Sequence, residues 1–568
     1  MKKDLKKSKK VSEPKVTKID LSKKTSKVIS KVKKHEKNVS EMKKDNLNYI
    51  LYAIGIIIIA LGVLFNNQCV DTKILGIVLG TISIPTKLVG LLMIGTTGVV
   101  STIKKNENPL IKSLLIILGI VFAATWLFPQ GTLNGSEFAM NESYGLGFNS
   151  VKEVIYNGST MIVDKIIFLL VIALFYKVAS STGAYNNVVN CIANKLKGKE
   201  KTAVLFTSVL VILLISFISE IYVVLFFLPF ILSILSKLKV DKTTAFAVTF
   251  GALMVGVIAS PYGTETLAAF KHYASFVEDT AFDLRLVLQV CIVILYTVFV
   301  ALRLKEMNKD EVFEEQFLIE EENKKANNKP LIAIFIITLI FMLIGYIDWF
   351  ANFEITVFQD FHKWLFELQL GDYKVFELII GAPAEVSMLG ALSLYDGATF
   401  LLIMITLLCV SYKISVAKFI DKVVETFKFT VKPVIVLVLI STIFFVGFKT
   451  QFYVSIGHYF LDLTPDFNPF LNVINAGLSG LFSADAGYTA FLFSSLFAER
   501  YAEAANVASL TYTSMAGLIQ LIVPMSPLLI GLYYTNVSYK KWIKYIALFV
   551  LGIFIILMIL LTVTTYLG

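Results

Sequence analysis

Apolar runs of about 20 residues recur along the 568-residue chain, and they limit its possible folds more than any other feature. The stretches Leu47 to Phe65 and Leu331 to Phe350 are two of them. A helix of this length crosses a hydrocarbon core of about 30 Å, and it satisfies its own backbone hydrogen bonds where water is absent. About eleven such runs predict an all-α polytopic membrane protein with about 11 transmembrane helices.

Positive charge is concentrated at the N-terminus. Residues 1–46 hold 17 Lys against 6 acidic residues, so the formal net charge of +10 leaves about −1 for the rest of the chain. This segment has no interleaved aromatic residues, so we expect no nucleic acid as a partner. We interpret it as a basic, disordered cytoplasmic tail that is attracted to anionic lipid headgroups.

Lysine clusters between the apolar runs set the predicted topology, because basic residues near span ends stay on the cytoplasmic side. They predict a multi-pass protein of the bacterial plasma membrane (cell membrane) with a cytoplasmic N-terminus. Residues 47–105 form two additional N-terminal spans, and residues 106–302 form a first transporter repeat. A charged cytoplasmic linker, 303–330, which we expect to be solvated, precedes a second transporter repeat at 331–568. Within this repeat, 413–431 carries four Lys and predicts an amphipathic interfacial helix before the next span.

Two apolar segments are interrupted in a way that single crossings are not. Residues 202–236 are broken by Ser216, Ser219 and Glu220 and have Lys-rich ends, which predicts a re-entrant hairpin from the cytoplasmic side. Residues 468–500 have Lys-poor flanks and predict a second re-entrant hairpin from outside. Non-helical backbone at such a tip is tolerated where it is buried in protein or lines a cavity.

The residues around the two breaks repeat at an offset of 265 to 266. The pairs are Glu220 and Asp485, Gly251 and Gly517, Ser260 and Ser526, and Pro261 and Pro527. The predicted spans at corresponding positions run in opposite directions, so we predict an inverted repeat. Chance similarity in a chain rich in Ser, Gly and small apolar residues is the alternative. Inverted repeats with broken helices are typical of secondary transporters, with the site near the bilayer midplane.

These breaks predict a binding site. Proline inside a helix frees the carbonyl four residues earlier, here that of Val257 and of Val523. Such carbonyls coordinate Na⁺ in transporters, and half-helix N-termini attract carboxylates. Glu220 and Asp485 each cost about 2.5–3.5 kcal/mol to keep near the centre of a membrane helix on insertion scales, which favours a functional role.

The candidate substrate- and ion-binding residues are Ser219, Glu220, Gly251, Ser260, Pro261, Thr264, Ser483, Asp485, Thr489, Gly517, Pro524 and Ser526. For each hydroxyl alone, a hydrogen bond back to its own helix is the simpler explanation. Glu265 and Glu385 fall at predicted span ends, where solvation explains them as well, and Asp164 and Lys165 are expected at the membrane interface. The four Cys and four His lack metal-ligand spacing, so any metal stays unknown.

From residue 110 to about 560 the chain resembles the C4-dicarboxylate anaerobic carrier-like (YfcC-type) family of the ion-transporter superfamily. The stretches that carry the resemblance are 175–203, FISEIYVVLFFLPFILSIL (217–235), FGALMVGVIASPYGTETL (250–267), SGLFSADAGYTAF (479–491) and 513–546. Here Pro524-Met525-Ser526 departs from the family's Pro-Thr-Ser, and Ser260-Pro261 stands where Asn-Pro is usual; both departures bear on the substrate. The resemblance implies transport of organic anions, amino acids or peptides with Na⁺ or H⁺ in an elevator-type mechanism.

We therefore predict a secondary active transporter for a small organic solute (an amino acid, peptide or carboxylate), coupled to Na⁺ or H⁺ or working by exchange, with no other cofactor. A membrane-embedded enzyme and an ion channel are the alternatives, and we expect no enzyme. The sequence places no Arg near the break of either hairpin, which favours amino acids or small peptides over dicarboxylates. A homodimer is left open.

A first test addresses the two acidic residues at the breaks. Glu220→Gln and Asp485→Asn should each impair coupled uptake in reconstituted vesicles while membrane expression stays at the wild-type level. Normal gradient-driven uptake by both variants would remove these carboxylates from the mechanism.

Overall fold

A computed structural model describes most of the chain. The described residues are 47–65, 73–105, 109–134, 137–140, 145–218, 220–262, 267–268, 270, 281–304, 311–318, 326–371, 373–382, 386–464, 466–481, 504–523 and 526–566. The chain divides into two compact units, Met1–Asn106 and Glu107–Gly568. Each unit is described by itself.

The first unit contains the two predicted N-terminal spans, helix Leu47–Leu64 and α2 (Lys73–Lys105). Their backbones approach closely at glycines: a methyl group at Gly90 would lie 2.9 Å from the carbonyl oxygen of Gly55. The Ser83 hydroxyl donates a hydrogen bond of 2.7 Å to the carbonyl of Gly62 on the other helix. Small residues and interhelical hydrogen bonds from hydroxyls hold helices together in lipid, where burial of apolar surface supplies little driving force for association.

The second unit is built from membrane-length helices. In the described part of the whole chain, nine helices are long and apolar enough to cross a membrane. Those of the second unit are α3 (Pro109–Leu127), α7 (Glu200–Phe217), α13 (Phe282–Arg303), α14 (Lys329–Tyr346), α18 (Leu394–Ser411), α19 (Val416–Thr450) and α25 (Tyr539–Tyr566). A bent pair, α5 (Val163–Ser181) and α6 (Ala184–Leu196), turns by 87° at Gly183, whose positive φ of 75° suits glycine. The prediction of an all-α multi-span membrane protein is confirmed.

Shorter elements complete the second unit. They are β1 (Gly131–Asn134), β2 (Glu137–Met140), α4 (Ser150–Thr160), α8 (Ile221–Val224), α9 (Leu228–Lys237), α10 (Lys242–Phe246), a π-helical turn (Ala247–Gly251), α11 (Ala252–Val257), α15 (Trp349–Phe353), α16 (Val357–Glu367), β3 (Gln369–Leu370), β4 (Tyr373–Lys374), α17 (Val375–Ile380), α20 (Phe452–Leu461), α21 (Pro469–Leu481), α23 (Ala505–Gln520) and α24 (Ser526–Thr535). The strands form two antiparallel ribbons, in which Gly131 pairs with Met140 and Gln369 with Lys374.

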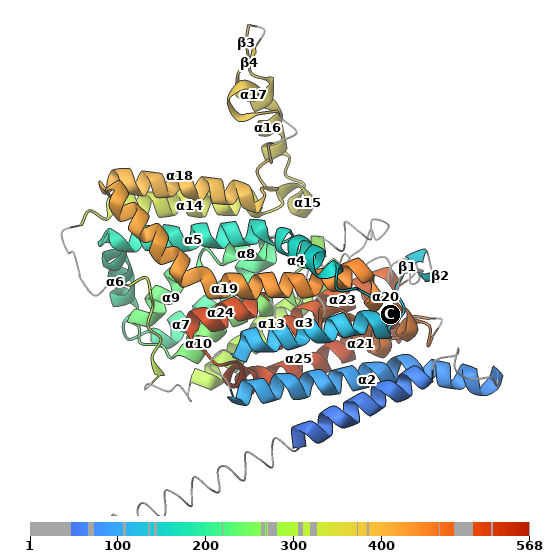
Figure 1. The fold of residues 1–568 in the computed structure, drawn as a ribbon. Coiled ribbons are helices and arrows are strands. Elements are labelled where there is room, and N and C mark those ends of the chain that lie inside the picture. The colour runs from blue at the N-terminus through green and yellow to red at the C-terminus, as the bar shows by residue number, and fades with distance from the viewer. Residues whose placement is uncertain are drawn as a thin grey trace, which may run out of the picture. The chain divides into compact units, whose positions relative to one another are not determined.

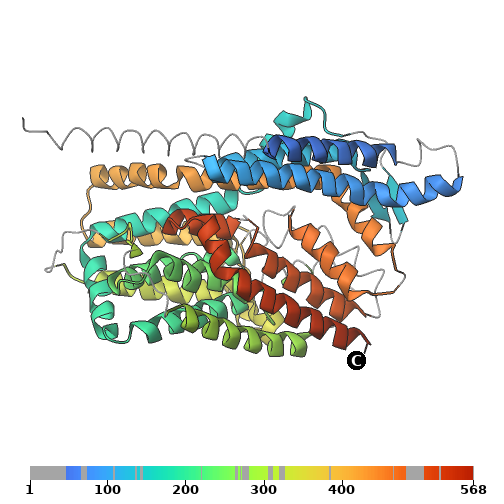
Figure 2. The same ribbon diagram turned by 90° about the horizontal axis from the view of Figure 1, so that it is seen from below.

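Helix α19 differs from its prediction. The expected interfacial helix 413–431 and the span after it form one helix of 35 residues with Pro433 inside. The helix changes direction along its length in Figure 1, because proline removes one backbone hydrogen bond and bends a helix without having to end it. α19 packs against α5, and the two lie side by side in both Figure 1 and Figure 2.

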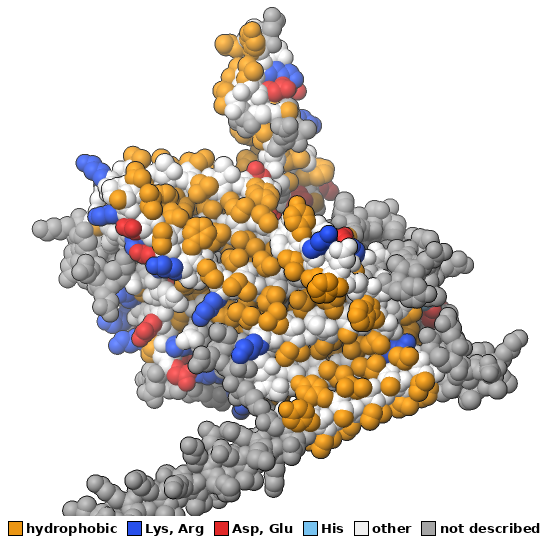
Figure 3. Space-filling view, viewed as in Figure 1, with side chains coloured by type: hydrophobic (Ala, Val, Ile, Leu, Met, Phe, Trp, Pro, Cys, Tyr) orange, Lys and Arg blue, Asp and Glu red, His pale blue; other side chains and the backbone are white. Residues whose placement is uncertain are grey.

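The surface of the second unit carries a broad apolar face. Figure 3 shows hydrophobic side chains over α18 and the adjacent helices, with Lys, Arg, Asp and Glu gathered toward the end where α6 and the start of α19 lie. Ile336 on α14 and Ile403 on α18 are 50% and 52% exposed. Exposed apolar area of this extent marks a membrane or protein contact, and on helices of spanning length it faces lipid.

The close glycine crossing of the first unit generates a stability prediction. Gly90→Leu should lower the free energy of unfolding in mixed micelles by about 1–3 kcal/mol, because the new side chain overpacks the contact with Gly55. Gly119→Leu on α3 is the control, since no atom lies within 4 Å of a methyl group at that position. Equal stability of the two variants would contradict the close crossing.

Candidate functional site

The first predicted break is present in the structure. α7 ends at Phe217, Ile218 and Glu220 have extended backbone, and the chain becomes helical again at α8. The Glu220 carboxylate accepts a hydrogen bond of 3.2 Å from the backbone N–H of Tyr222 and so caps α8. Ile218 forms an antiparallel bridge with Ile347, directly after α14. The segment 202–236 is therefore not an unbroken crossing.

A second break follows the continuous helix formed by α10, the π-helical turn and α11. This helix ends at Val257, and Ser260 and Pro261 lie in the non-helical residues after it. The buried hydroxyl of Ser260 donates 3.0 Å to the carbonyl oxygen of Ser216 in the last turn of α7. The two breaks of the first repeat are thus joined directly.

Gly251 has a packing role in this helix. A methyl group there would lie 2.7 Å from the hydroxyl of Tyr296 on α13 and 2.9 Å from the ring of Trp542 on α25. The Tyr296 hydroxyl donates 2.7 Å to the carbonyl of Ala247, in the π-helical turn. π-Helical turns leave backbone groups free for such bonds and often lie near functional sites.

Helices at corresponding positions of the two predicted repeats pack in the same way. α7 packs against α11 in the first copy, α21 packs against α23 in the second, and α11 packs against α23. At this contact a methyl group on Gly517 would lie 2.7 Å from the Cα of Ile258. Gly517 therefore lets the backbones of the two repeats meet.

Pro261 and Pro527 were predicted to interrupt helices from the inside, and the structure places neither of them in the interior of a helix. Pro527 stands in the first turn of α24, where the missing N–H costs nothing, and Pro261 lies in the non-helical break. Val257 and Val523 lie at or just after helix ends, so their carbonyls lack helical partners because the helices stop there. The cause is helix termination and not a proline inside a helix.

Several predicted site residues lie outside the described residues. They are Ser219, Thr264, Ser483, Asp485, Thr489 and Pro524, together with Glu265 and Glu385. Ser526 begins α24, but its side chain is outside the described part.

Arg285, in the first turns of α13, is a site residue that the sequence interpretation missed. Its side chain is 1% exposed. The guanidinium donates from Nη1 to Thr513 Oγ1 at 2.6 Å and from Nη2 to Ser509 Oγ at 2.8 Å. Both hydroxyls belong to α23, so this cation joins α13 to α23.

Gln289 lies one turn along α13 from Arg285. Its Nε2 donates 2.6 Å to the hydroxyl of Ser216 at the hairpin break. Its Oε1 is buried and has no hydrogen-bond partner among the described residues, and the same holds for Ser514 Oγ and Gln520 Oε1 on α23. Buried polar atoms are rarely left unsatisfied, so each of these three atoms is suited to contact with a polar ligand or water.

Lys165 is a second cation beside the same break. It was expected at the interface, but it is 4% exposed and its Nζ lies 5.4 Å from the ring centroid of Tyr222 on α8. We expected no Arg near a break; Arg285 lies one turn along α13 from Gln289, whose side chain contacts Ser216 at the end of α7. One signal in the sequence could have pointed to Arg285: Arg is rare in this chain and stands at three of the 52 basic positions.

A cavity of about 490 Å³ lies on the cytoplasmic side of the predicted topology, among α5, α19, α9 and α24. All four helices contribute to its lining, which includes Ala173, Leu228, Lys428, Lys432 and Tyr533. Gln316 and Phe317, from the linker after α13, also line it. The linker thus contributes to the wall of a cavity between helices.

The linker 303–330 was expected to be solvated, but part of it, residues 311–318, is buried between helices at alternate positions. Phe313 and Phe317 are 2% and 1% exposed. The Phe313 N–H donates 2.9 Å to the carbonyl of Val240, and Glu311 forms an ion pair with Lys541. Buried and exposed positions alternate from Phe313 through Glu315 to Phe317, which allows this short stretch to insert between helices although the linker as a whole is charged.

Glu315 is buried within this stretch. Its Oε1 accepts a hydrogen bond of 2.6 Å from the Tyr534 hydroxyl, and its N–H donates 3.2 Å to Ser236 Oγ. The ring of Phe317 packs between those of Tyr176 and Tyr534, with centroids 5.5 and 6.1 Å away. The stretch therefore ties α5, α9 and α24 together.

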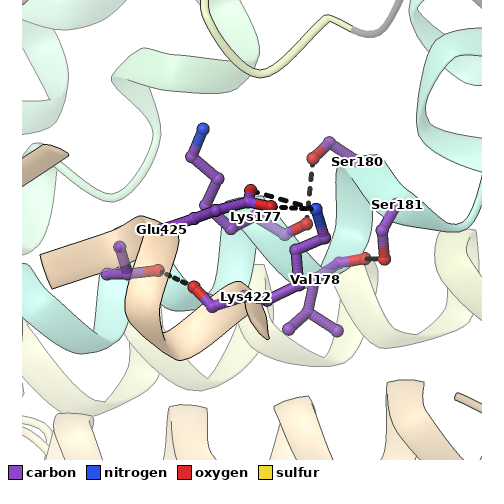
Figure 4. A network of polar contacts seen from close by, with 7 residues as sticks. Lys177, Val178, Ser180, Ser181, Lys422 and Glu425 are labelled. Atoms are coloured by element: carbon purple, nitrogen blue, oxygen red, sulfur yellow. Dashed lines mark hydrogen bonds and ion pairs between the residues drawn. The ribbon is translucent and has the colours of Figure 1, made fainter. Parts of the chain in front are cut away.

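Polar groups continue from this cavity along α5 and α19 (Figure 4). Lys422 forms an ion pair of 2.8 Å with Glu425 on α19. Lys177 on α5 has its Nζ 5.4 Å from the ring centroid of Phe317. These contacts line the facing sides of the two helices near the end of α5.

The break between α7 and α8, with buried charged and amide side chains beside it, is a feature that membrane transporters place at their binding sites. The chain belongs to the C4-dicarboxylate anaerobic carrier (DcuC) family, whose sequence profile it matches over residues 108–566. This match confirms the resemblance seen in the sequence and makes the protein a transporter, not an enzyme.

Two further comparisons add little to this assignment. The solved structure of the Alcanivorax borkumensis YdaH transporter aligns with 80% of this chain and 97% of its own, at 13% identity and a TM-score of 0.36. A score of that size does not establish a common fold. Among curated proteins no match was found.

Glu315, which lies outside the spans, generates a pH prediction. Burial raises the pKa of its carboxyl to about 8, from an ordinary value of 4.5. Between these values the folded protein holds the proton that the unfolded chain has lost, so the free energy of unfolding should fall as pH rises, by up to about 1.4 kcal/mol per pH unit.

Thermal unfolding in detergent from pH 5 to 9 measures this slope. Glu315→Gln should flatten it, whereas Glu314→Gln, at the exposed neighbouring position, should leave it unchanged. The same slope in both variants would show that Glu315 does not titrate in this window.

Proposed function

We propose that this protein transports C4-dicarboxylates by secondary active transport, coupled to Na⁺ or H⁺ or by exchange. The observation that carries the proposal is the buried Arg285 between the two repeats. Guanidinium is planar and matches a carboxylate with two parallel hydrogen bonds. The family gives the substrate class, and this residue supplies a chemical reason for it.

Two of the hydrogen bonds of Arg285 are suited to exchange for a ligand. They go to neutral hydroxyls, on Ser509 and Thr513, and Arg285 has further interactions beside these two. A carboxylate adds an opposite charge and can accept two parallel hydrogen bonds from the guanidinium, which a hydroxyl cannot do. A substrate carboxylate would therefore compete with the hydroxyls at the guanidinium, and the hydroxyls could then donate to the same carboxylate.

A dicarboxylate needs a second positive partner, and Lys165 provides one. Lys165 adjoins Tyr222 on α8, whereas Arg285 adjoins α23, and Gln289 on α13 bonds Ser216 at the break between them. Two cations near one broken helix suit a small dianion. This replaces the preference for amino acids or small peptides, which rested on the supposed lack of an Arg.

Glu220 supports a second candidate ligand, a cation, beside the break between α7 and α8. Its carboxylate caps α8 at the break and would attract a cation. We propose that it serves the coupling ion; the ammonium of an amino acid substrate is the alternative. Na⁺ and H⁺ are both compatible with this carboxylate.

The inverted repeat and the elevator motion are part of the proposal. Matching pairs of helices, α7 with α11 and α21 with α23, support two copies of one unit. These four helices would slide against a layer that contains α5, α18 and α19. The cavity of about 490 Å³ lies between α5 and α19 of this layer on one side and α9 and α24 on the other. The N-terminus would be cytoplasmic, as the Lys clusters predict.

Replacing Arg285 tests this function. Arg285→Gln should lower kcat/KM for succinate uptake into proteoliposomes about 10- to 100-fold, since a hydrogen bond to a charged group contributes about 1.5–3 kcal/mol. Arg285→Lys should recover part of the loss, because Lys keeps the positive charge but cannot form the two parallel hydrogen bonds of a guanidinium.

Arg303→Lys, on the same helix and against the rings of Phe299 and Tyr545, is the matched control and should transport normally. Wild-type succinate uptake by Arg285→Gln would contradict the proposal. Competition by neutral amino acids but not by succinate would favour the second candidate.

A further inference from the structure

A large apolar cavity lies apart from the candidate transport site. It has a volume of about 830 Å³ and lies among α6, α7, α9 and α14. Its lining is almost entirely carbon, with Leu210 on α7, Ile231 on α9 and Leu339 on α14 as examples. A small dianion would find no polar partners along these walls, so this is no second substrate site.

The cavity exists because α14 stands away from the α7–α9 hairpin. α14 packs against α18 and α6, and the ring of Phe335 closes the inner wall, 5.3 Å from those of Phe175 and Phe230. The outer side is open, since Phe206 is 65% exposed and Ile336 is 50% exposed. In a membrane this opening faces lipid.

The length of the cavity fits one acyl chain. Along α14 its lining runs from Leu331 to Leu343, which is about 18 Å at 1.5 Å per residue. One leaflet supplies about 15 Å of a hydrocarbon core that is about 30 Å thick. An acyl chain from a single leaflet therefore covers most of the length of the cavity.

One end of the cavity is basic. Lys199 and Thr202 belong to its lining, and Lys195, Lys197 and Lys201 are exposed in the same stretch of chain. The one acidic side chain in that stretch, Glu200, accepts a hydrogen bond from the N–H of Gly198. The excess of Lys favours an anionic headgroup at this end.

We propose that the cavity holds an acyl chain of an anionic phospholipid, with its phosphate at Lys199 and Thr202. The bound chain fills the space between α14 and the α7–α9 hairpin. It would thereby support the helix whose end forms the break at Ile218.

Native mass spectrometry of the purified protein tests the site with phosphatidylglycerol and phosphatidylethanolamine. The wild type should retain one phosphatidylglycerol after detergent washing. Leu210→Trp, which fills the cavity, should lower retention at least 10-fold, whereas Leu213→Trp, at an exposed position of the same helix outside the lining, should not.

Surface variants keep the test valid if Leu210→Trp fails to fold. Lys199→Gln should remove the preference for phosphatidylglycerol over phosphatidylethanolamine, and Lys195→Gln, outside the lining, should preserve it. Equal retention by Leu210→Trp and the wild type, retention of a free fatty acid in place of phospholipid, or an unchanged preference in Lys199→Gln would overturn the proposal.

Discussion

Burial of the Arg285 guanidinium between the two repeats is the constraint on which the account of this protein depends. A charge inside the membrane is costly and persists where it has partners or a role. Here the hydroxyls of Ser509 and Thr513 hold it, and Gln289, one turn away, holds the hairpin break through Ser216. A single helix, α13, thus connects the polar parts of both repeats, and replacing the neutral acceptors with a carboxylate would change contacts in both at once.

Two kinds of packing surround this centre. Where α23 meets the residues after α11, backbones approach without side chains between them, as at Gly517 and Ile258, and this contact is stiff because interiors at such density deform little. Between α5 and α19 on one side and α9 and α24 on the other lies a cavity, partly closed by Phe317. The proposed elevator motion would take place across this boundary.

Much of this architecture could be predicted from the sequence. The spans follow from apolar runs, the break near Glu220 from polar residues inside such a run, and the family from local motifs. The contacts of Arg285 could not be predicted, because its position at the start of a span looks like an ordinary flanking charge. Lys165 has the same ambiguity. Only the packing of α5 on α8, and of α13 on α23, decides that these charges are buried.

The linker and α19 show a second limit. A charged composition hides the alternation that buries Phe313 and Phe317, and Pro433 suggests a helix end although the structure accommodates it as a bend. In both places local preference yields to tertiary packing. The break predicted at Asp485 lies within 482–503, outside the described residues, so it stays a prediction.

Calorimetric binding of succinate and its monoamide, succinamate, to the wild type and to Arg285→Gln tests the central claim most directly. If Arg285 binds a substrate carboxylate, replacing one carboxylate by an amide should weaken binding at least 10-fold in the wild type and little in the variant. Equal weakening in both proteins would mean that the carboxylate and Arg285 do not interact.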